Sequence, residues 1–215
     1  MILIGQYDSP FVRRVAIALV EYGLPYEHEP WSVWADAERL AAYNPLRRVP
    51  VLVLDGGECL VESSAILDAL DEQVGPARAL LPRSGAERRA GLRVCSLATG
   101  LADKAVSRLY EHVLRPEAQR SALWLDRCDA QIRAVLGALE AERAGRPGPW
   151  WLGERLSHAD VAVGCALRFL GEAHPDLYRP AEWPALAGAA DACEARPSFR
   201  RVVQPLKVEL RPSSE

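Results

Sequence analysis

Short apolar runs recur in the first third of the chain. Those at residues 2–6, 26–31 and 51–54 predict strands. The Asp-Gly-Gly sequence at 55–57 predicts a tight turn, so a fourth strand is expected over 58–60. This part of the chain therefore predicts a small sheet.

A helix is predicted directly after the first strand. Ser9 and Pro10 are the residue types preferred at the N-cap and at the first position of a helix. Apolar residues then recur every three or four positions as far as Gly23, where the helix is expected to end.

Two further helices complete this half of the chain. A short one is expected over 40–43, and Ser63 or Ser64 is expected to cap a longer one that stops before Gly75. The order β-α-β-α-β-β-α predicts a mixed sheet with helices packed on it.

A domain boundary is expected where Pro and Gly accumulate, at residues 76–85. We assign 1–78 to an α/β domain, 79–85 to a linker and 86–215 to an all-helical domain. The fold class is therefore α/β plus all-α.

The second domain shows helical periodicity almost throughout. Helices are expected over 86–115, over 125–139, over 184–194 and over 198–203. Another is expected to begin at Ser157, with Asp160 completing a capping box and Leu156 facing Val161 as a hydrophobic staple.

Charge and composition narrow the classes of function. The net charge is −3, and no run of Lys and Arg exceeds two residues, which argues against a nucleic-acid surface. No apolar stretch approaches the roughly 20 residues of a membrane span. The N-terminal sequence lacks a signal peptide, so we expect a cytoplasmic protein. The five cysteines are scattered and form no CxxC pair, so neither a disulfide framework nor a metal site is expected.

A proline directly precedes the predicted third strand, at Val49-Pro50. In a strand, proline would remove a hydrogen-bond donor from the ladder. A cis bond would resolve this conflict and would turn the Val49 N–H and C=O outward, toward a peptide-like ligand. Because only about 5–6% of such bonds are cis, the position of the proline alone favours trans.

Three motifs in the first domain resemble those of cytosolic glutathione transferases, especially the plant tau class and its bacterial relatives. They are Ser-Pro-Phe-Val-Arg-Arg-Val at 9–15, Asn-Pro-Leu-Arg-Arg-Val-Pro-Val-Leu at 44–52 and Val-Glu-Ser-Ser-Ala-Ile at 61–66. The resemblance implies a thioredoxin-like N-terminal domain, an all-helical C-terminal domain and a cis bond before Pro50. It implies glutathione as co-substrate, with no metal.

The resemblance also implies roles for individual residues. Ser9 would activate the glutathione thiol, and the Val49 backbone, with Pro50 after it, would pair with the cysteinyl part. Glu62 and Ser63 would hold the γ-glutamyl end, and Arg48 would meet the glycyl carboxylate.

Each of these assignments has an alternative. Ser9 taken alone is more simply a helix cap. Glu62 and Ser63 taken alone are equally typical of solvated residues that open a helix, and Arg48 taken alone is more typical of a surface charge. Tyr7 is a rival activator of the thiol, because other classes of the family use a tyrosine near the end of this strand. Some relatives have Cys at the position of Ser9. This chain has Ser there and no other Cys nearby in the sequence, so mixed-disulfide chemistry is not expected.

The implied activity is conjugation of glutathione to a small, hydrophobic electrophile. The electrophile site is expected to include Phe11 together with Asp103, Ser107 and Tyr110. Isomerisation or peroxide reduction on the same site, or a non-catalytic binding or stress protein, are the alternatives. The family also implies a homodimer, for which residues 58–64 and 88–102 are the expected contacts.

Overall fold

The computed structural model describes residues 1–208, which form two compact units. Among the described residues, the first unit contains Met1–Leu80 and residues 197–208, and the second contains Leu81–Arg196. Among residues 1–208, no helix is both long enough and apolar enough to cross a membrane.

The first unit is built on a four-stranded mixed sheet with the strand order β2-β1-β3-β4. The strands are β1 (Ile2–Ile4), β2 (Glu27–Glu29), β3 (Val51–Val53) and β4 (Cys59–Val61). β2 runs parallel to β1, whereas β3 is antiparallel to both β1 and β4. The mixed sheet expected from the sequence is therefore confirmed.

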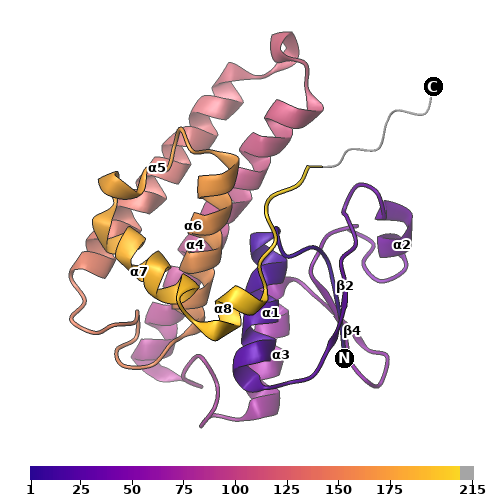
Figure 1. Ribbon diagram of the computed structural model, residues 1–215, viewed down its shortest axis with the longest axis vertical. Helices are drawn as coiled ribbons and strands as arrows, with labels where there is room; N and C mark the ends of the chain where they lie inside the picture. The colour runs from indigo at the N-terminus through magenta and orange to yellow at the C-terminus, as the bar shows by residue number, and fades with distance from the viewer. Residues whose placement is uncertain (209–215) are drawn as a thin grey trace. The chain divides into compact units, whose positions relative to one another are not determined.

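Helices cover both faces of this sheet. They are α1 (Pro10–Tyr22), α2 (Ala37–Ala41), α3 (Ser63–Val74) and α8 (Pro197–Arg201). α1 and α3 lie side by side on one face, and α2 lies on the other (Figure 1). Apolar side chains of β1, β3 and α2 meet in the core through Ile4, Val51 and Leu40.

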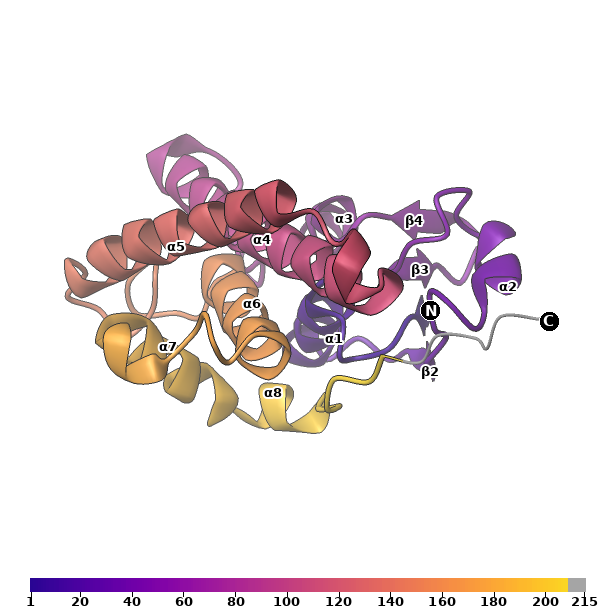
Figure 2. The same ribbon diagram turned by 90° about the horizontal axis from the view of Figure 1, so that it is seen from above.

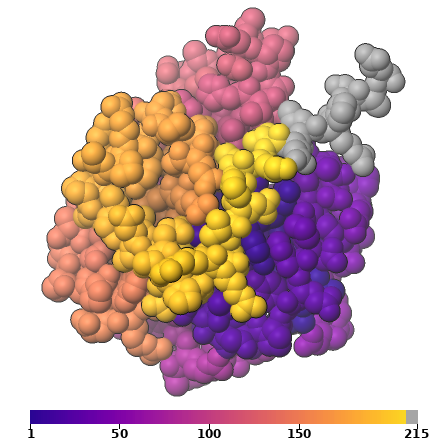
Figure 3. Space-filling view, viewed as in Figure 1, coloured from indigo at the N-terminus to yellow at the C-terminus, as the bar shows by residue number. Residues whose placement is uncertain are grey.

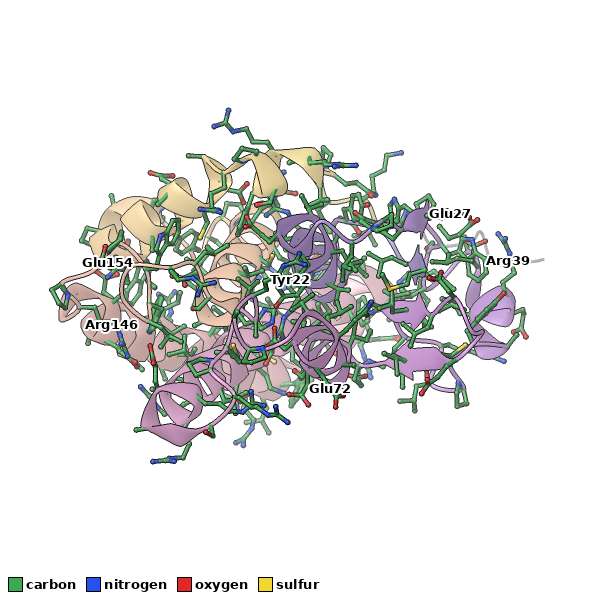
Figure 4. All side chains as sticks on the ribbon, turned by 90° about the horizontal axis from the view of Figure 1, so that it is seen from below. Tyr22, Glu27, Arg39, Glu72, Arg146 and Glu154 are labelled. Carbon is green, nitrogen blue, oxygen red and sulfur yellow. The ribbon has the colours of Figure 1, made fainter. Side chains whose placement is uncertain are left out.

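The end of α1 is tied to α3 and to the chain that leaves it. The Tyr22 hydroxyl, labelled in Figure 4, donates to the Asp71 carboxylate of α3. The Leu80 N–H donates to both groups at 3.1 Å. Burial raises the pKa of the Tyr22 phenol, so this hydroxyl remains a donor at neutral pH.

The second unit is helical, as expected. It contains α4 (Gly85–Leu114), α5 (Ala122–Ala144), α6 (His158–Ala173) and α7 (Pro184–Glu194), with short 3-10 turns η1 (Glu117–Gln119) and η2 (Pro180–Glu182). α6 is buried along nearly its whole length and packs against α4 and α7. α5 packs against α4 (Figure 2).

The start of α6 confirms the predicted capping box. The Asp160 carboxylate accepts the Ser157 N–H at 2.9 Å and the Ser157 hydroxyl at 2.6 Å, and the Ser157 side chain in turn caps the Asp160 N–H. The same carboxylate accepts the N–H of the fully buried Trp151 at 2.7 Å. The box therefore fixes both the helix and the chain that leads into it.

Replacing Ser157 with alanine should lower the free energy of unfolding by about 1 kcal/mol, because an N-cap side chain of α6 is lost. For a chain of this size the melting temperature should fall by about 2–4 °C. Thermal unfolding followed by circular dichroism measures this. An unchanged melting temperature would contradict a stabilising role for the box.

Two local expectations differ from the structure. The short helix expected over 40–43 begins at Ala37 instead. Neither Ser63 nor Ser64 caps α3, because the N-cap position belongs to Glu62 and Ser63 is the first helical residue. The Ser63 hydroxyl instead accepts a 3.5 Å hydrogen bond from the Arg14 guanidinium of α1.

The division of the chain also differs from the expected one. Residues 197–208, expected in the helical domain 86–215, group with the first unit. The reason is the buried Arg13, whose guanidinium donates to the carbonyl oxygens of Phe199 and Val202. Residues 209–215 lie outside the described residues, and the limits of the linker 79–85 stay a prediction.

Candidate functional site

Ser9 lies at the N-terminus of α1, as its N-cap. Its Oγ accepts a hydrogen bond from the Val12 N–H at 3.4 Å. This bond uses the oxygen as an acceptor and leaves the O–H as a donor. Ser9 as a whole is half-buried.

The loop before β3 is shaped by the buried Asn44. Its Nδ2 donates to the Arg48 carbonyl oxygen at 2.9 Å, and its Oδ1 accepts the Leu46 N–H at 3.0 Å. The loop ends in a cis bond at Val49-Pro50, which confirms the expectation drawn from the resemblance. Sequence reasoning missed the role of Asn44; the only available signal was the Asn-Pro pair that opens the motif.

Gly5 brings this loop against the start of α1. A Cβ atom built on Gly5 would lie 2.6 Å from Val12 Cγ2 and 2.8 Å from Val49 Cβ, closer than real contacts allow. Gly5 also has φ +127°, which favours glycine. A larger residue at position 5 would separate Val49 from the helical turn that Ser9 caps.

Glu62 and Ser63 lie at the junction of β4 and α3. Glu62 has φ +66°, a conformation that costs a non-glycine residue roughly 1–3 kcal/mol and that is frequent at functional sites. Its carboxylate lies 3.8 Å from the Arg48 guanidinium, and both side chains are about half exposed. The structure therefore brings Arg48, in the loop before β3, close to Glu62, which Ser63 directly follows in the sequence.

Tyr7, which follows β1, contacts two aromatic residues: Tyr26, just before β2, and His28, within β2. Its ring stacks on His28 with centroids 3.8 Å apart, and its hydroxyl lies 2.9 Å from the Tyr26 hydroxyl. Burial, together with the hydrogen bond to Tyr26, raises the pKa of the Tyr7 phenol, which is neutral at physiological pH. Either hydroxyl of this pair can be the donor, so Ser9 and Tyr7 both remain candidates for the thiol activator.

The residues expected at the electrophile site lie in both units. Phe11 is half-buried in the first turn of α1. Asp103, Ser107 and Tyr110 are spaced along α4 so that they share one face of the helix, and the Ser107 hydroxyl donates to the Asp103 carbonyl oxygen at 2.8 Å. Their participation in binding stays a prediction.

Models of known protein families match both domains of the chain. Residues 3–78 match the model of the glutathione S-transferase N-terminal domain, and residues 122–200 match that of the C-terminal domain. These matches confirm the thioredoxin-like and helical domains that the motifs implied.

Individual relatives match over nearly the whole chain. The uncharacterised GST-like protein YibF of Escherichia coli is 31% identical over 95% of this chain and 99% of its own, and a maleylacetoacetate isomerase of Pseudomonas aeruginosa is 31% identical over 94% of each. A glutathione S-transferase from Methylobacterium radiotolerans, solved in complex with glutathione sulfonate, superposes with a TM-score of 0.91 at 35% identity, covering 98% of both chains. The chain belongs to the glutathione S-transferase family.

Proposed function

We propose that this protein is a glutathione transferase that stabilises the glutathione thiolate at Ser9 and adds the sulfur to a small electrophile. The observation that carries the proposal is the Ser9 hydroxyl, held by the Val12 N–H at the N-terminus of α1. The sulfur supplies the nucleophile, and binding both reactants side by side lowers the barrier further.

The free energy available at Ser9 is sufficient for this chemistry. Lowering a thiol pKa from about 8.5 by two units requires about 2.7 kcal/mol of selective stabilisation of the thiolate. A hydroxyl donor to a charged acceptor supplies roughly 1.5–3 kcal/mol, and a helix N-terminus adds about 0.3–1 kcal/mol. Because Pro10 has no N–H, the site depends mainly on the hydroxyl.

The γ-glutamyl end of glutathione carries an ammonium and a carboxylate, and the start of α3 suits both. Glu62 offers a half-exposed carboxylate for the ammonium. Ser63, the first residue of α3, is buried and its hydroxyl oxygen accepts a hydrogen bond from Arg14, so the N–H groups at this helix N-terminus are the main donors for the carboxylate. Glu62 has a positive φ at this junction, which is an unusual backbone conformation for a residue other than glycine.

The remaining contacts follow the loop before β3. The Val49 backbone is our candidate partner for the cysteinyl part, and Arg48 for the glycyl carboxylate. An exposed ion pair such as Arg48 with Glu62 contributes roughly 0–1 kcal/mol, so ligand groups of opposite charge can replace it at little cost.

Glutathione-dependent isomerisation is the second candidate function. It is supported by the maleylacetoacetate isomerase of Pseudomonas aeruginosa, which matches this chain over nearly its full length. The same activated thiol would add to the substrate double bond and convert it to a single bond, and after rotation about that bond the thiolate would leave as the double bond re-forms. The two functions therefore differ in the substrate rather than in the thiol site.

Retention on immobilised glutathione, followed by two assays, tests both candidates. Conjugation of a generic aryl halide reports transfer, and conversion of maleylacetoacetate reports isomerisation. We expect retention, elution by free glutathione and turnover of the aryl halide. Retention without either turnover would indicate a binding protein, and the absence of glutathione binding by calorimetry would overturn the proposal.

We further propose that the protein acts in the cytoplasm, the compartment in which glutathione keeps thiols reduced. Phe11, Asp103, Ser107 and Tyr110 remain the candidates for contact with the electrophile. Alanine variants of the three α4 residues should change KM for the electrophile and leave the affinity for glutathione unchanged.

A homodimer is expected in solution. The proposed contacts include residues 58–64, which contain the edge strand β4, and residues 88–102 of α4, where the Leu92 side chain is 41% exposed. Sedimentation equilibrium at micromolar concentration should give twice the chain mass of 23.6 kDa. A single-chain mass would contradict the proposal, and Leu92→Glu should weaken the dimer if α4 forms the contact.

A further inference from the structure

Residues 202–208, which we name the C-terminal strap, return to the beginning of the chain. Figure 3 shows them lying over the N-terminal part of the first unit, to which they belong. The strap follows α8 directly, so its first residues are placed by that helix. Its later residues pass the turn that leads into α1.

Arg13 anchors the beginning of the strap. It is almost fully buried in the first turn of α1, and its Nε donates to the Val202 carbonyl oxygen at 3.0 Å. Its Nη2 donates to the Phe199 carbonyl oxygen at 3.2 Å, and the guanidinium lies over the Phe199 ring, 5.4 Å from its centroid. A buried guanidinium needs such partners, so this anchor is a fixed part of the fold.

The strap then binds the two residues that directly precede Ser9. The Gln204 Oε1 accepts the Tyr7 N–H at 3.0 Å, and the Lys207 N–H donates to the Asp8 carboxylate at 3.1 Å. These bonds join positions 197 and 199 residues apart in the sequence. One bond of the strap therefore reaches the backbone that enters the helix cap, at Tyr7, and the other reaches the side chain of Asp8.

The Tyr7–Ser9 turn is held by the core of the first unit as well. The Tyr7 ring is stacked on His28, and the Ser9 N–H donates to the Gln6 carbonyl oxygen at 3.2 Å. The bond from Gln204 thus acts on a turn that has limited freedom. A small displacement of this turn shifts the Ser9 hydroxyl, whose hydrogen bond weakens steeply with distance and angle.

We propose that Gln204 is a positioning residue for thiol activation: by accepting the Tyr7 N–H, it fixes the turn that aims the Ser9 hydroxyl at the glutathione sulfur. This inference rests on the proposed function, since it assumes that Ser9 stabilises the thiolate. Gln204 acts through Ser9 and touches neither reactant in the proposal. A perturbed strap should therefore change the pKa of the bound thiol more than the affinity for glutathione.

Gln204→Met is the main test, because methionine keeps the length of the side chain and removes the amide acceptor. The pKa of enzyme-bound glutathione, measured from thiolate absorbance and from the pH profile of kcat/KM, should rise by about 0.5–1 unit. At pH 6.5 kcat/KM should fall about two- to fivefold, with the dissociation constant of glutathione changed less than twofold. Val203→Ala is the matched control, since the Val203 side chain is 45% exposed on the same segment.

Ser9→Ala, measured in parallel, separates the proposed role of Gln204 from the proposed thiol activation by Ser9. If Ser9→Ala raises the thiol pKa and Gln204→Met does not, the role of Gln204 is wrong and the proposed function stands. If Ser9→Ala leaves the thiol pKa unchanged, the proposed activation at Ser9 fails first. If Gln204→Met lowers the stability of the protein but leaves the thiol pKa at its wild-type value, Gln204 has only a structural role. This result also overturns the inference. Gln204→Ala supplies a second variant should the methionine protein fail to fold.

Discussion

Replacing Ser9 with alanine is expected to lower kcat/KM for conjugation by about one to three orders of magnitude. The hydroxyl is the main donor available to the thiolate, because Pro10 contributes no N–H at this helix start. The dissociation constant of glutathione should change only several-fold, since the proposed γ-glutamyl contacts lie at α3. The pKa of the bound thiol should move up toward its ordinary value of about 8.5.

Two controls separate catalysis from folding in this experiment. Losing the N-cap also destabilises α1 by roughly 0.5–2 kcal/mol, so the rates are compared on protein shown to be folded by its melting curve. Ser9→Thr keeps both the cap and the hydroxyl and should retain most of the rate. If Ser9→Ala keeps the wild-type rate, Ser9 is only a cap, and Tyr7→Phe becomes the next variant to measure.

Local signals in the sequence predicted the elements that carry the site. The Ser9-Pro10 pair marked the start of α1, and the Ser157 box marked the start of α6, because capping depends on residues within one turn of the helix. The strands were found from short apolar runs for the same local reason.

Contacts between distant positions explain what the sequence could not predict. Ser63 has the residue type of a cap, but its hydroxyl instead accepts a hydrogen bond from the Arg14 guanidinium, 49 residues earlier in the sequence. Arg13 and Arg14 look like surface charges in a sequence, yet both are buried where α8 and α3 supply oxygen acceptors. Local periodicity carries no information about which distant group satisfies a polar side chain.

The backbone conformation of Glu62 is a second feature that the sequence could not predict. A positive φ is usually indicated by Gly or Asn, and Glu gives no such signal. The motif at 61–66 pointed to this residue only through its resemblance to the family. The conformation therefore adds an independent observation in favour of the glutathione contact proposed for Glu62.

Glu62→Gln should weaken the binding of glutathione about 10- to 100-fold, because it removes the charge that pairs with the γ-glutamyl ammonium. Hydrogen bonds to charged groups contribute roughly 1.5–3 kcal/mol, and each 1.4 kcal/mol corresponds to tenfold in affinity. Glutamine has the same shape and meets the same backbone cost at φ +66°, so the substitution isolates the charge. The exposed pair with Arg48 adds little to the effect.

The kinetic signature of Glu62→Gln should be the reverse of that of Ser9→Ala. The ammonium contact is made equally in the ground state and the transition state, so KM for glutathione should rise while kcat at saturation and the pKa of the bound thiol stay near their wild-type values. Glu72→Gln is the matched control, since Glu72 is an exposed carboxylate on the same helix, labelled in Figure 4. Isothermal titration with glutathione measures the affinity directly. Equal affinities for the Glu62→Gln and Glu72→Gln proteins would mean that the γ-glutamyl group binds elsewhere, whereas a loss confined to Glu62→Gln places the ammonium at the junction of β4 and α3.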